Sequence, residues 1–143
     1  MTLIMNRILV FGTFDGLHPG HINFFEQAKK LGDRLIAVVA RDVTVQNVKG
    51  HLPRKNENER LADVENCEIV DEALLGNLDD PYAIIKKINP DIIALGYDQN
   101  SFTAGLPEYI KKENLNIEIT RLKPFEPDRY HSSLVSWKNT LNL

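Results

Sequence analysis

Two histidines three residues apart, His18 and His21, are the side chains best suited to chemistry in this sequence of 143 residues. They end a run of small and polar residues that starts at Gly12 and leads into a segment with helical periodicity. At a helix start, free backbone N–H groups and the helix dipole favour an anion. Histidines at i and i+3 project from one side of the first turn, where both imidazoles could donate hydrogen bonds to a phosphate chain.

The glycines of the same run, Gly12 and Gly20, are expected to let a ligand approach the backbone closely. Two histidines could also belong to a metal site, but no cysteine and no carboxylate at helical spacing beside them completes one. The Rossmann glycine spacing and the P-loop lysine are both missing, which argues against those two nucleotide sites. An ordinary surface or core role for each histidine stays open at this point.

Short apolar runs that alternate with amphipathic segments must position these residues. Strands are expected at 8–11, 35–40, 69–75, 91–95 and 117–122, and helices at 20–31, 56–66, 80–88 and 107–114. Residues 41–55 are polar and basic and predict a long functional loop, and a last helix is expected from about Ser132. Strands that are apolar throughout predict an α/β fold, a doubly wound five-stranded parallel sheet in one domain over residues 1–143. Ligands bind such sheets beyond the carboxyl ends of the strands.

Composition narrows the class of protein. Hydrophobic residues at 43% and charged residues at 26% are typical of an ordinary soluble globular protein, and the net charge of −3 argues against a nucleic-acid partner. The single cysteine, Cys67, excludes an intramolecular disulfide and a thiolate metal cluster. No apolar run approaches the roughly 20 residues that span a bilayer. The sequence therefore indicates a soluble, cytoplasmic protein without a membrane partner.

The run Gly12-Thr13-Phe14-Asp15, followed by His18-Pro19-Gly20-His21, resembles the GTFD…HxGH motif of the cytidylyltransferase-like nucleotidyltransferases. Other stretches fall where that family places its ligand-contacting segments: Ala40-Arg41-Asp42, Lys49-Gly50, Glu59-Arg60, Leu95–Gln99 and His131–Ser133. The ‘ARD…KG’, ‘LGYDQ’ and ‘HSS’ stretches are most similar to the archaeal-type FAD synthase subgroup, which transfers AMP from ATP to FMN. The resemblance implies a Rossmann-like three-layer sandwich, an enzyme that acts on small molecules, and a homodimer.

The resemblance also implies a mechanism and a role for each matched residue. The acceptor phosphate attacks the α-phosphorus in line, while His18 and His21 stabilise the phosphate chain. Nucleotide contacts are expected from Gly12, Thr13, Phe14, Asp15, His18, Gly20, His21, Gly96, Asp98, Arg129, Ser132 and Ser133, and acceptor contacts from Arg41, Lys49 and Arg60, with Lys49 also catalytic. Mg²⁺ is expected with ATP, held mainly by phosphate oxygens and water rather than by the protein.

Ordinary readings of some of these residues remain open. Lys49 could be a solvated surface lysine, Arg60 part of an exposed helix face, and Asp98 a turn aspartate. The two serines could simply cap a helix.

Rival substrates fit the same fold. One alternative is CTP with glycerol 3-phosphate, although residues 123–129 differ from the form expected in glycerol-phosphate cytidylyltransferases. Another is ATP with a heptose 1-phosphate of lipopolysaccharide core synthesis. A non-catalytic nucleotide-binding module and a purely structural protein are alternatives of other classes.

Overall fold

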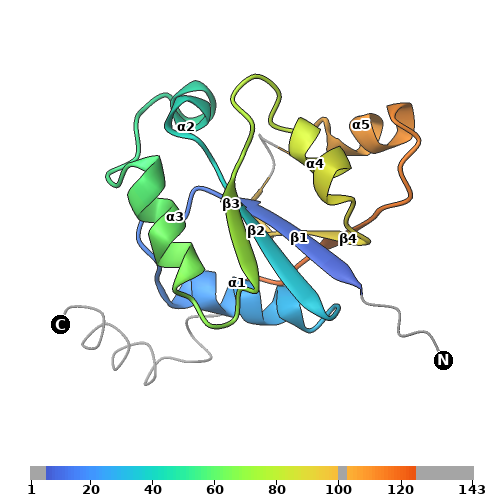
Figure 1. Ribbon diagram of the computed structural model, residues 1–143, viewed down its shortest axis with the longest axis horizontal. Helices are drawn as coiled ribbons and strands as arrows, with labels where there is room; N and C mark the ends of the chain where they lie inside the picture. Colours follow the sequence, from blue (N-terminus) through green and yellow to red (C-terminus); the bar gives the residue numbers. More distant parts are fainter. Residues whose placement is uncertain (1–5, 100–102, 125–143) are drawn as a thin grey trace.

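The computed structural model describes residues 6–99 and 103–124, in which five strands form one parallel sheet with the order β3-β2-β1-β4-β5 (Figure 1). The strands are β1 (Arg7–Gly12), β2 (Arg34–Val39), β3 (Glu72–Leu75), β4 (Ile92–Leu95) and β5 (Glu118–Arg121). Because β1 pairs with both β2 and β4, the strand order reverses at β1. The doubly wound parallel sheet predicted from the sequence is confirmed.

Helices cover both faces of this sheet, which gives three layers (Figure 1). The helices are α1 (Pro19–Lys29), α2 (Asp42–Lys49), α3 (Glu57–Glu65), α4 (Ala83–Ile88) and α5 (Leu106–Lys112). The helices α1 and α3 pack on one face, whereas α4 and α5 pack on the other. The helix α2 lies beyond the carboxyl ends of the strands.

The alternating side chains of β1 explain why this strand is apolar throughout. Ile8 and Val10 are fully buried on the side of α1 and α3. Leu9 and Phe11 point the other way, into the cluster with α4 and α5, and expose at most 4% of their surface. A strand between two helical layers has no face for polar side chains, so both sets must be apolar.

The largest differences from the sequence prediction concern three segments. Residues 41–55 were expected to be a loop, but Asp42–Lys49 form a helix that ends on Gly50 with a φ of 81°. The helix α4 begins at Ala83, because the preceding residues form a turn in which Asp80 accepts a hydrogen bond from the Tyr82 N–H at 3.0 Å. The strand predicted at 69–75 is shorter, at 72–75. The helix expected from Ser132 lies outside the described residues.

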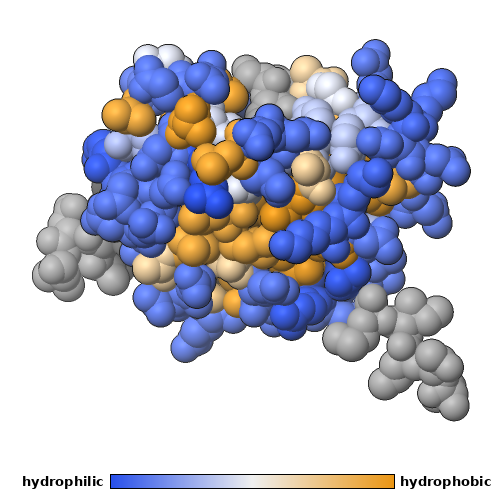
Figure 2. Space-filling model, turned by 45° about the horizontal axis from the view of Figure 1, so that its top comes forward, coloured by the Kyte–Doolittle hydropathy of each residue, from blue (hydrophilic) through white to orange (hydrophobic). Residues whose placement is uncertain are grey.

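The exposed large apolar side chains share one location. In the part of the chain that the structure describes, all of them follow the carboxyl end of a strand, namely Val43, Val48 and Leu52 after β2, Leu78 after β3 and Tyr97 after β4. With the top of the molecule turned forward, apolar residues are visible among hydrophilic ones on this side (Figure 2). Within residues 6–99 and 103–124, no helix is both long enough and apolar enough to cross a bilayer.

Candidate active site

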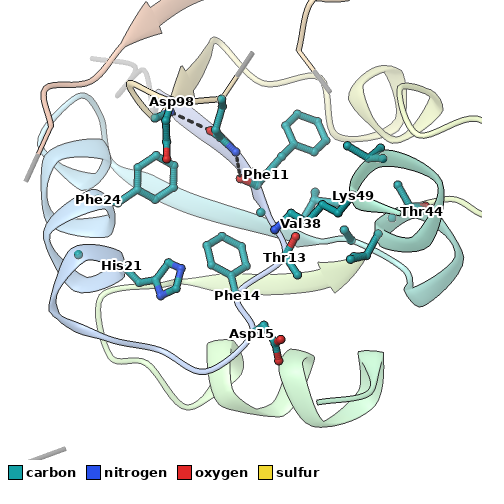
Figure 3. Close-up of a pocket in the computed structure, with 18 of the residues that line it drawn as sticks. Phe11, Thr13, Phe14, Asp15, His21, Phe24, Val38, Thr44, Lys49 and Asp98 are labelled. Carbon is teal, nitrogen blue, oxygen red and sulfur yellow. Dashed lines mark hydrogen bonds between the residues drawn. The ribbon is translucent and has the colours of Figure 1, made fainter. Parts of the chain in front are cut away.

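The carboxyl ends of the strands open into a pocket of about 860 Å³, at the point where the strand order reverses. Segments that follow β1, β2, β3 and β4 all contribute to its lining (Figure 3). The predicted site residues that line it are Gly12, Thr13, Phe14, Asp15, His18, Gly20, His21, Arg41, Lys49, Gly96 and Asp98. Arg60 lies behind the lining, and Arg129, Ser132 and Ser133 lie outside the described residues.

The two histidines build the start of α1 themselves. His18 is the N-cap, and its Nδ1 accepts a hydrogen bond from the Gly20 N–H at 3.0 Å. In return, Nδ1 of His21 accepts from the His18 N–H at 3.3 Å. The two rings stack with centroids 3.9 Å apart and planes inclined by 30°. This is a capping box made of imidazoles in place of the usual hydroxyl and carboxylate.

The capping bonds indicate the tautomer of both neutral imidazole rings. Each Nδ1 acts as an acceptor, so the proton of the neutral imidazole must sit on Nε2. That assignment gives each ring one N–H donor at the end opposite to its capping bond. The sequence predicted donors at this place, and the capping bonds explain which nitrogen carries the proton.

The surroundings of His21 keep its ring neutral. Burial lowers its pKa from 6.5 to about 4, and the nearby His18 and Lys49 act in the same direction. The charge of Asp98 and the backbone of Gly16 oppose this shift without cancelling it. The site thus brings together His21 from α1, Lys49 from α2 and Asp98 from the turn after β4.

The glycines of the motif make room for side chains of the protein. A Cβ at Gly12 would lie 2.4 Å from the ring of Phe14, and one at Gly20 would lie 2.8 Å from the ring of His18. Packing against Phe14 and His18 thus requires glycine at these two positions, and close approach of a ligand to their backbone stays a prediction. Phe14 has a φ of 54°, which is uncommon for a bulky residue. Its buried ring contacts the His21 ring in an edge-to-face arrangement, with the ring centroids 5.6 Å apart. The β1–α1 bend thus packs the Phe14 ring against the second histidine, His21.

Asp15 lines the pocket, but its carboxylate ties the bend to another segment. Its two oxygens accept hydrogen bonds from the backbone N–H groups of Arg54 and Lys55 at 2.8 Å and 2.9 Å. Burial acts to raise the pKa of Asp15, but these two bonds and the charges of Arg54 and Arg60 outweigh it and lower the pKa. Asp15 thus joins the β1–α1 bend to the chain just before α3.

Arg60 is fully buried, so the interpretation as an exposed helix face is wrong. Its guanidinium donates to the Lys55 carbonyl at 3.0 Å, to the Thr13 carbonyl at 2.7 Å and to the Asp42 carboxylate at 2.8 Å. These partners belong to the segment before α3, the β1–α1 bend and the start of α2. The predicted acceptor contact is not made from this position, where Arg60 holds three segments together.

Arg41 anchors the start of α2 in a similar way. It donates to the Gly76 carbonyl at 2.8 Å and pairs with the Glu57 carboxylate at 2.9 Å. The other oxygen of Glu57 accepts from the Asp42 N–H at 2.9 Å. Arg41 still lines the pocket, and about a quarter of its side chain, 28%, is exposed. It therefore borders the site while its guanidinium is shared with the protein.

Lys49 is the last residue of α2 and not part of a loop. It lines the pocket together with Thr44, Val45 and Val48 of the same helix (Figure 3). Val45 is the buried residue of α2. Lys49 is thus carried by a short helix with one buried residue. The N-terminal end of this helix is held by the hydrogen bonds of Arg41 and Arg60.

Sequence reasoning missed several residues that line the pocket. Apolar side chains form part of the wall, namely Phe11, Val38, Val45, Val48 and Pro81. Gln99 and Lys123 also line it, and both backbone polar groups of Lys123 are held by the side chain of Gln27. Gln99 belonged to a recognised stretch, so its amide beside an acidic residue was an available signal. The apolar wall gave none, because its members come from four separate segments.

Metal ligands are sparse in the described part of the chain. Residues 6–99 and 103–124 contain no group of three or more His, Cys, Asp or Glu side chains that could hold a metal ion. The pocket lining holds two imidazoles and three cationic side chains, Arg41, Lys49 and Arg54, which suit phosphate oxygens. The carboxylates of Asp15 and Asp98 line it as well.

Comparison with known proteins adds a family and several relatives. Residues 9–136 match the family described as cytidylyltransferase-like. Curated relatives named FAD synthase include one from Aciduliprofundum boonei, 45% identical over 85% of this chain and 80% of its own length. Another, from Thermoplasma volcanium, is 41% identical over 94% of both chains. A third, from Methanosarcina barkeri, is 48% identical over 82% of this chain and 84% of its own.

Solved structures share the fold and carry different names. A structure from Thermoplasma volcanium, named a lipopolysaccharide core biosynthesis protein, is 42% identical and covers 85% of this chain and 99% of its own, with a TM-score of 0.80. A protein of unknown function from Archaeoglobus fulgidus has a TM-score of 0.67 at 17% identity, with 82% of this chain and 89% of its own covered. At that identity the likeness concerns the fold alone.

Proposed function

Because the chain belongs to the cytidylyltransferase-like family, we propose that it is a nucleotidyltransferase that transfers AMP from ATP to FMN and forms FAD and pyrophosphate. The observation that carries this proposal is the pair of stacked imidazoles at the start of α1, with each Nδ1 engaged in a capping bond, beside a pocket of about 860 Å³. Relatives that are 41–48% identical over most of the chain and are named FAD synthase support the choice of substrates.

In the proposed reaction, a phosphate oxygen of FMN attacks the α-phosphorus of ATP. A new P–O bond forms as the bond to the β-phosphate oxygen breaks, and pyrophosphate leaves with the electron pair. Negative charge grows on the phosphate chain during this step. The Nε2–H groups of His18 and His21 are positioned to stabilise that charge, and Lys49 adds a positive charge from α2.

The apolar part of the pocket wall favours a flavin as the acceptor. Val38 from β2, Val45 and Val48 from α2 and Pro81 after β3 all line the pocket. A planar isoalloxazine ring can bury apolar surface against such a wall, whereas a polyol or a sugar would lose hydrogen bonds to water there. An acceptor with a large apolar ring and a phosphate group matches both halves of the pocket.

A heptose 1-phosphate is the second candidate acceptor, because the Thermoplasma volcanium structure at 42% identity carries a lipopolysaccharide name. The same fold and the same histidines would serve that reaction. The two proposals therefore differ in the acceptor half of the pocket, where the apolar wall supports the flavin.

Further parts of the proposal concern cofactor and assembly. We propose that Mg²⁺ accompanies ATP, coordinated by phosphate oxygens and water, since such an arrangement needs few protein ligands. We also propose a homodimer that acts in the cytoplasm, by analogy with the family. Gel filtration with light scattering tests the dimer, and replacement of Mg²⁺ by other divalent ions tests the metal.

A substrate panel tests the reaction. The protein is incubated with ATP or CTP and with FMN, glycerol 3-phosphate or heptose 1-phosphate, and both pyrophosphate and the mass of the product are measured. FAD formed from ATP and FMN is the expected result. Turnover with a sugar phosphate in preference to FMN would move the assignment to the second candidate. ATP binding without pyrophosphate release from any pair would indicate a non-catalytic nucleotide-binding module.

A further inference from the structure

The side chain of Gln99 occupies an unusual place between two strands. β1 and β4 pair through Ile8 with Ile92 and Leu9 with Ile93. A continuation of this register would bring the Phe11 carbonyl to the Gly96 N–H. Instead, Oε1 of Gln99 accepts from the Gly96 N–H at 2.8 Å, and its Nε2 donates to the Phe11 carbonyl at 2.8 Å (Figure 3).

A primary amide offers the same donor and acceptor as a peptide group. Gln99 therefore acts as an inserted rung of the sheet, which keeps the carboxyl ends of β1 and β4 apart by one amide group. This is the point where the strand order reverses and the pocket opens. The separation of the strands at the floor of the pocket is thus determined by one side chain.

The turn that contains Gln99 is also held from the other side. Nη1 of Arg121, in β5, donates to the carbonyls of Gly96 and Gln99 at 2.8 Å and 3.0 Å. The hydroxyl of Thr103 donates to the same Gln99 carbonyl. The turn is therefore fixed both to β1 and to β5, although its two middle residues, Tyr97 and Asp98, are exposed.

We propose that Gln99 is a positioning residue for the nucleoside of ATP. Asp98 precedes it directly and lines the pocket together with His18 and His21, which follow β1. Because Gln99 bonds to both β1 and the turn, it sets the distance between the nucleoside contacts at the turn and the phosphate contacts at the histidines. This inference rests on the proposed function in that it takes ATP as the ligand.

Two substitutions separate the bridge from other effects of Gln99. Gln99→Leu removes both hydrogen bonds without a change in charge. Gln99→Glu keeps the acceptor for Gly96 but places a second oxygen against the Phe11 carbonyl. A protonated carboxyl group restores the missing donor, so the effect of Gln99→Glu should depend on pH. Gln46→Glu, on the exposed side of α2, makes the same change in charge as a control.

Binding of ATP with Mg²⁺ is measured by calorimetry between pH 5 and pH 8, after circular dichroism has established that each variant is folded. Gln99→Leu should bind ATP about tenfold more weakly at every pH, because two bridging hydrogen bonds are lost. Gln99→Glu should bind as weakly at pH 8 and recover to within about threefold of the unmodified protein at pH 5. Gln46→Glu should bind like the unmodified protein throughout.

Steady-state kinetics add a readout that a merely structural role would not give. The KM for ATP should rise in both Gln99 variants, with the KM for FMN and the kcat at saturating ATP little changed. Unchanged ATP binding by Gln99→Leu, or no recovery of Gln99→Glu at low pH, would overturn the inference. If the unmodified protein binds ATP but forms no FAD, the proposed acceptor fails, while the binding comparison still tests Gln99.

Discussion

The two halves of the pocket are built by opposite means. At the start of α1, the imidazoles of His18 and His21 are part of the helix cap, and the ring of Phe14, which packs against His21, is 3% exposed. Across the pocket, α2 has one buried residue, and polar contacts at its first turn hold it in place. The first half is fixed by packing, whereas the second is fixed by charged hydrogen bonds.

This difference corresponds to two tasks of a nucleotidyltransferase. Every such enzyme must stabilise the phosphate chain, whereas the acceptor differs from one enzyme to another. Stabilisation of the phosphate chain requires donors that do not reorganise, and a cap whose two imidazoles are held by hydrogen bonds to the backbone supplies them. Choice of acceptor requires a surface that can change in sequence without loss of the core, and an exposed helix supplies that. Substitutions on the α1 side should therefore alter the rate, and substitutions on the α2 side should alter the preference for the acceptor.

The largest effect is expected from His18→Asn. Asparagine is a good N-cap, so the first turn of α1 should persist while the Nε2–H donor is lost. We expect kcat to fall by about 10²- to 10³-fold, with a melting temperature close to that of the unmodified protein. His51→Asn, at an exposed histidine outside the pocket lining, is the matched control. Equal turnover by the two variants would remove His18 from the mechanism.

Arg60→Leu tests the anchor that joins the two halves. The substitution leaves the Asp42 carboxylate and the carbonyls of Thr13 and Lys55 without their buried donor. The free energy of unfolding, measured with urea, should fall by about 3 kcal/mol or more. Arg34→Leu breaks an exposed ion pair with Glu72 and should cost less than about 1 kcal/mol. A similar cost for both variants would contradict the role of Arg60.

Lys49→Ala tests the charge that α2 brings to the histidines. We expect kcat/KM to fall by about 10- to 100-fold, because the phosphates lose one positive partner. The charge of Lys49 lowers the pKa of His21, so its removal should raise that pKa above about 4. NMR titration of the His21 ring measures this shift. Lys49→Arg keeps the positive charge and should leave the pKa of His21 close to its value in the unmodified protein. If Lys49→Ala does not change the pKa of His21, the ammonium group of Lys49 does not act on the histidine.

The acceptor half can be probed with two valines of the same helix. Val48 lines the pocket and Val43 does not, while both are almost equally exposed, at 43% and 46%. Val48→Ser should raise the KM for FMN by about threefold to tenfold, because apolar contact with the ring is lost. Val43→Ser should leave it unchanged, and neither should affect the KM for ATP. The same rise in both variants would mean that α2 acts through its stability alone.

The smallest effect concerns pH and the α1 half. The pKa of His21 is lower in the folded protein, at about 4, than its ordinary value of 6.5. Between these values the unfolded chain binds more protons, so stability should fall as the pH drops from about 6.5 to 4. Melting temperatures recorded across this range should decline less in His21→Asn. An equal decline would assign the pH dependence to other groups.

Apolar runs were sufficient to predict the sheet. Each of the five strands overlaps its predicted range. The central strands β1, β2 and β4 are covered on both faces and are therefore apolar at most positions, whereas the edge strands β3 and β5 also carry charged residues. The helix α2 was missed for the opposite reason. With one buried residue, Val45, it shows no apolar stripe, so its sequence looks like that of a polar loop.

The candidate site was predicted where the chemistry is local in sequence. The motif from Gly12 to His21 forms a single bend, so its residues could be placed together without knowledge of the fold. Arg60 was misjudged, because its partners are contributed by three other segments and a buried arginine cannot be told from an exposed one by its neighbours in sequence. The Gln99 side chain bonds to Phe11, which lies 88 positions away in the sequence. Its role could be recognised only once the order of the strands was known.

The contact between Phe14 and Gly12 limits how the bend can be inherited or transplanted. Any side chain at position 12 would collide with the aromatic ring and expel it from the core, so the glycine and the phenylalanine must be kept together. The Phe14 ring in turn packs against the ring of Phe25, in the second turn of α1, with the ring centroids 5.2 Å apart. An engineer who moves this bend to another scaffold must therefore bring the buried aromatic residues that pack against it as well as the histidines.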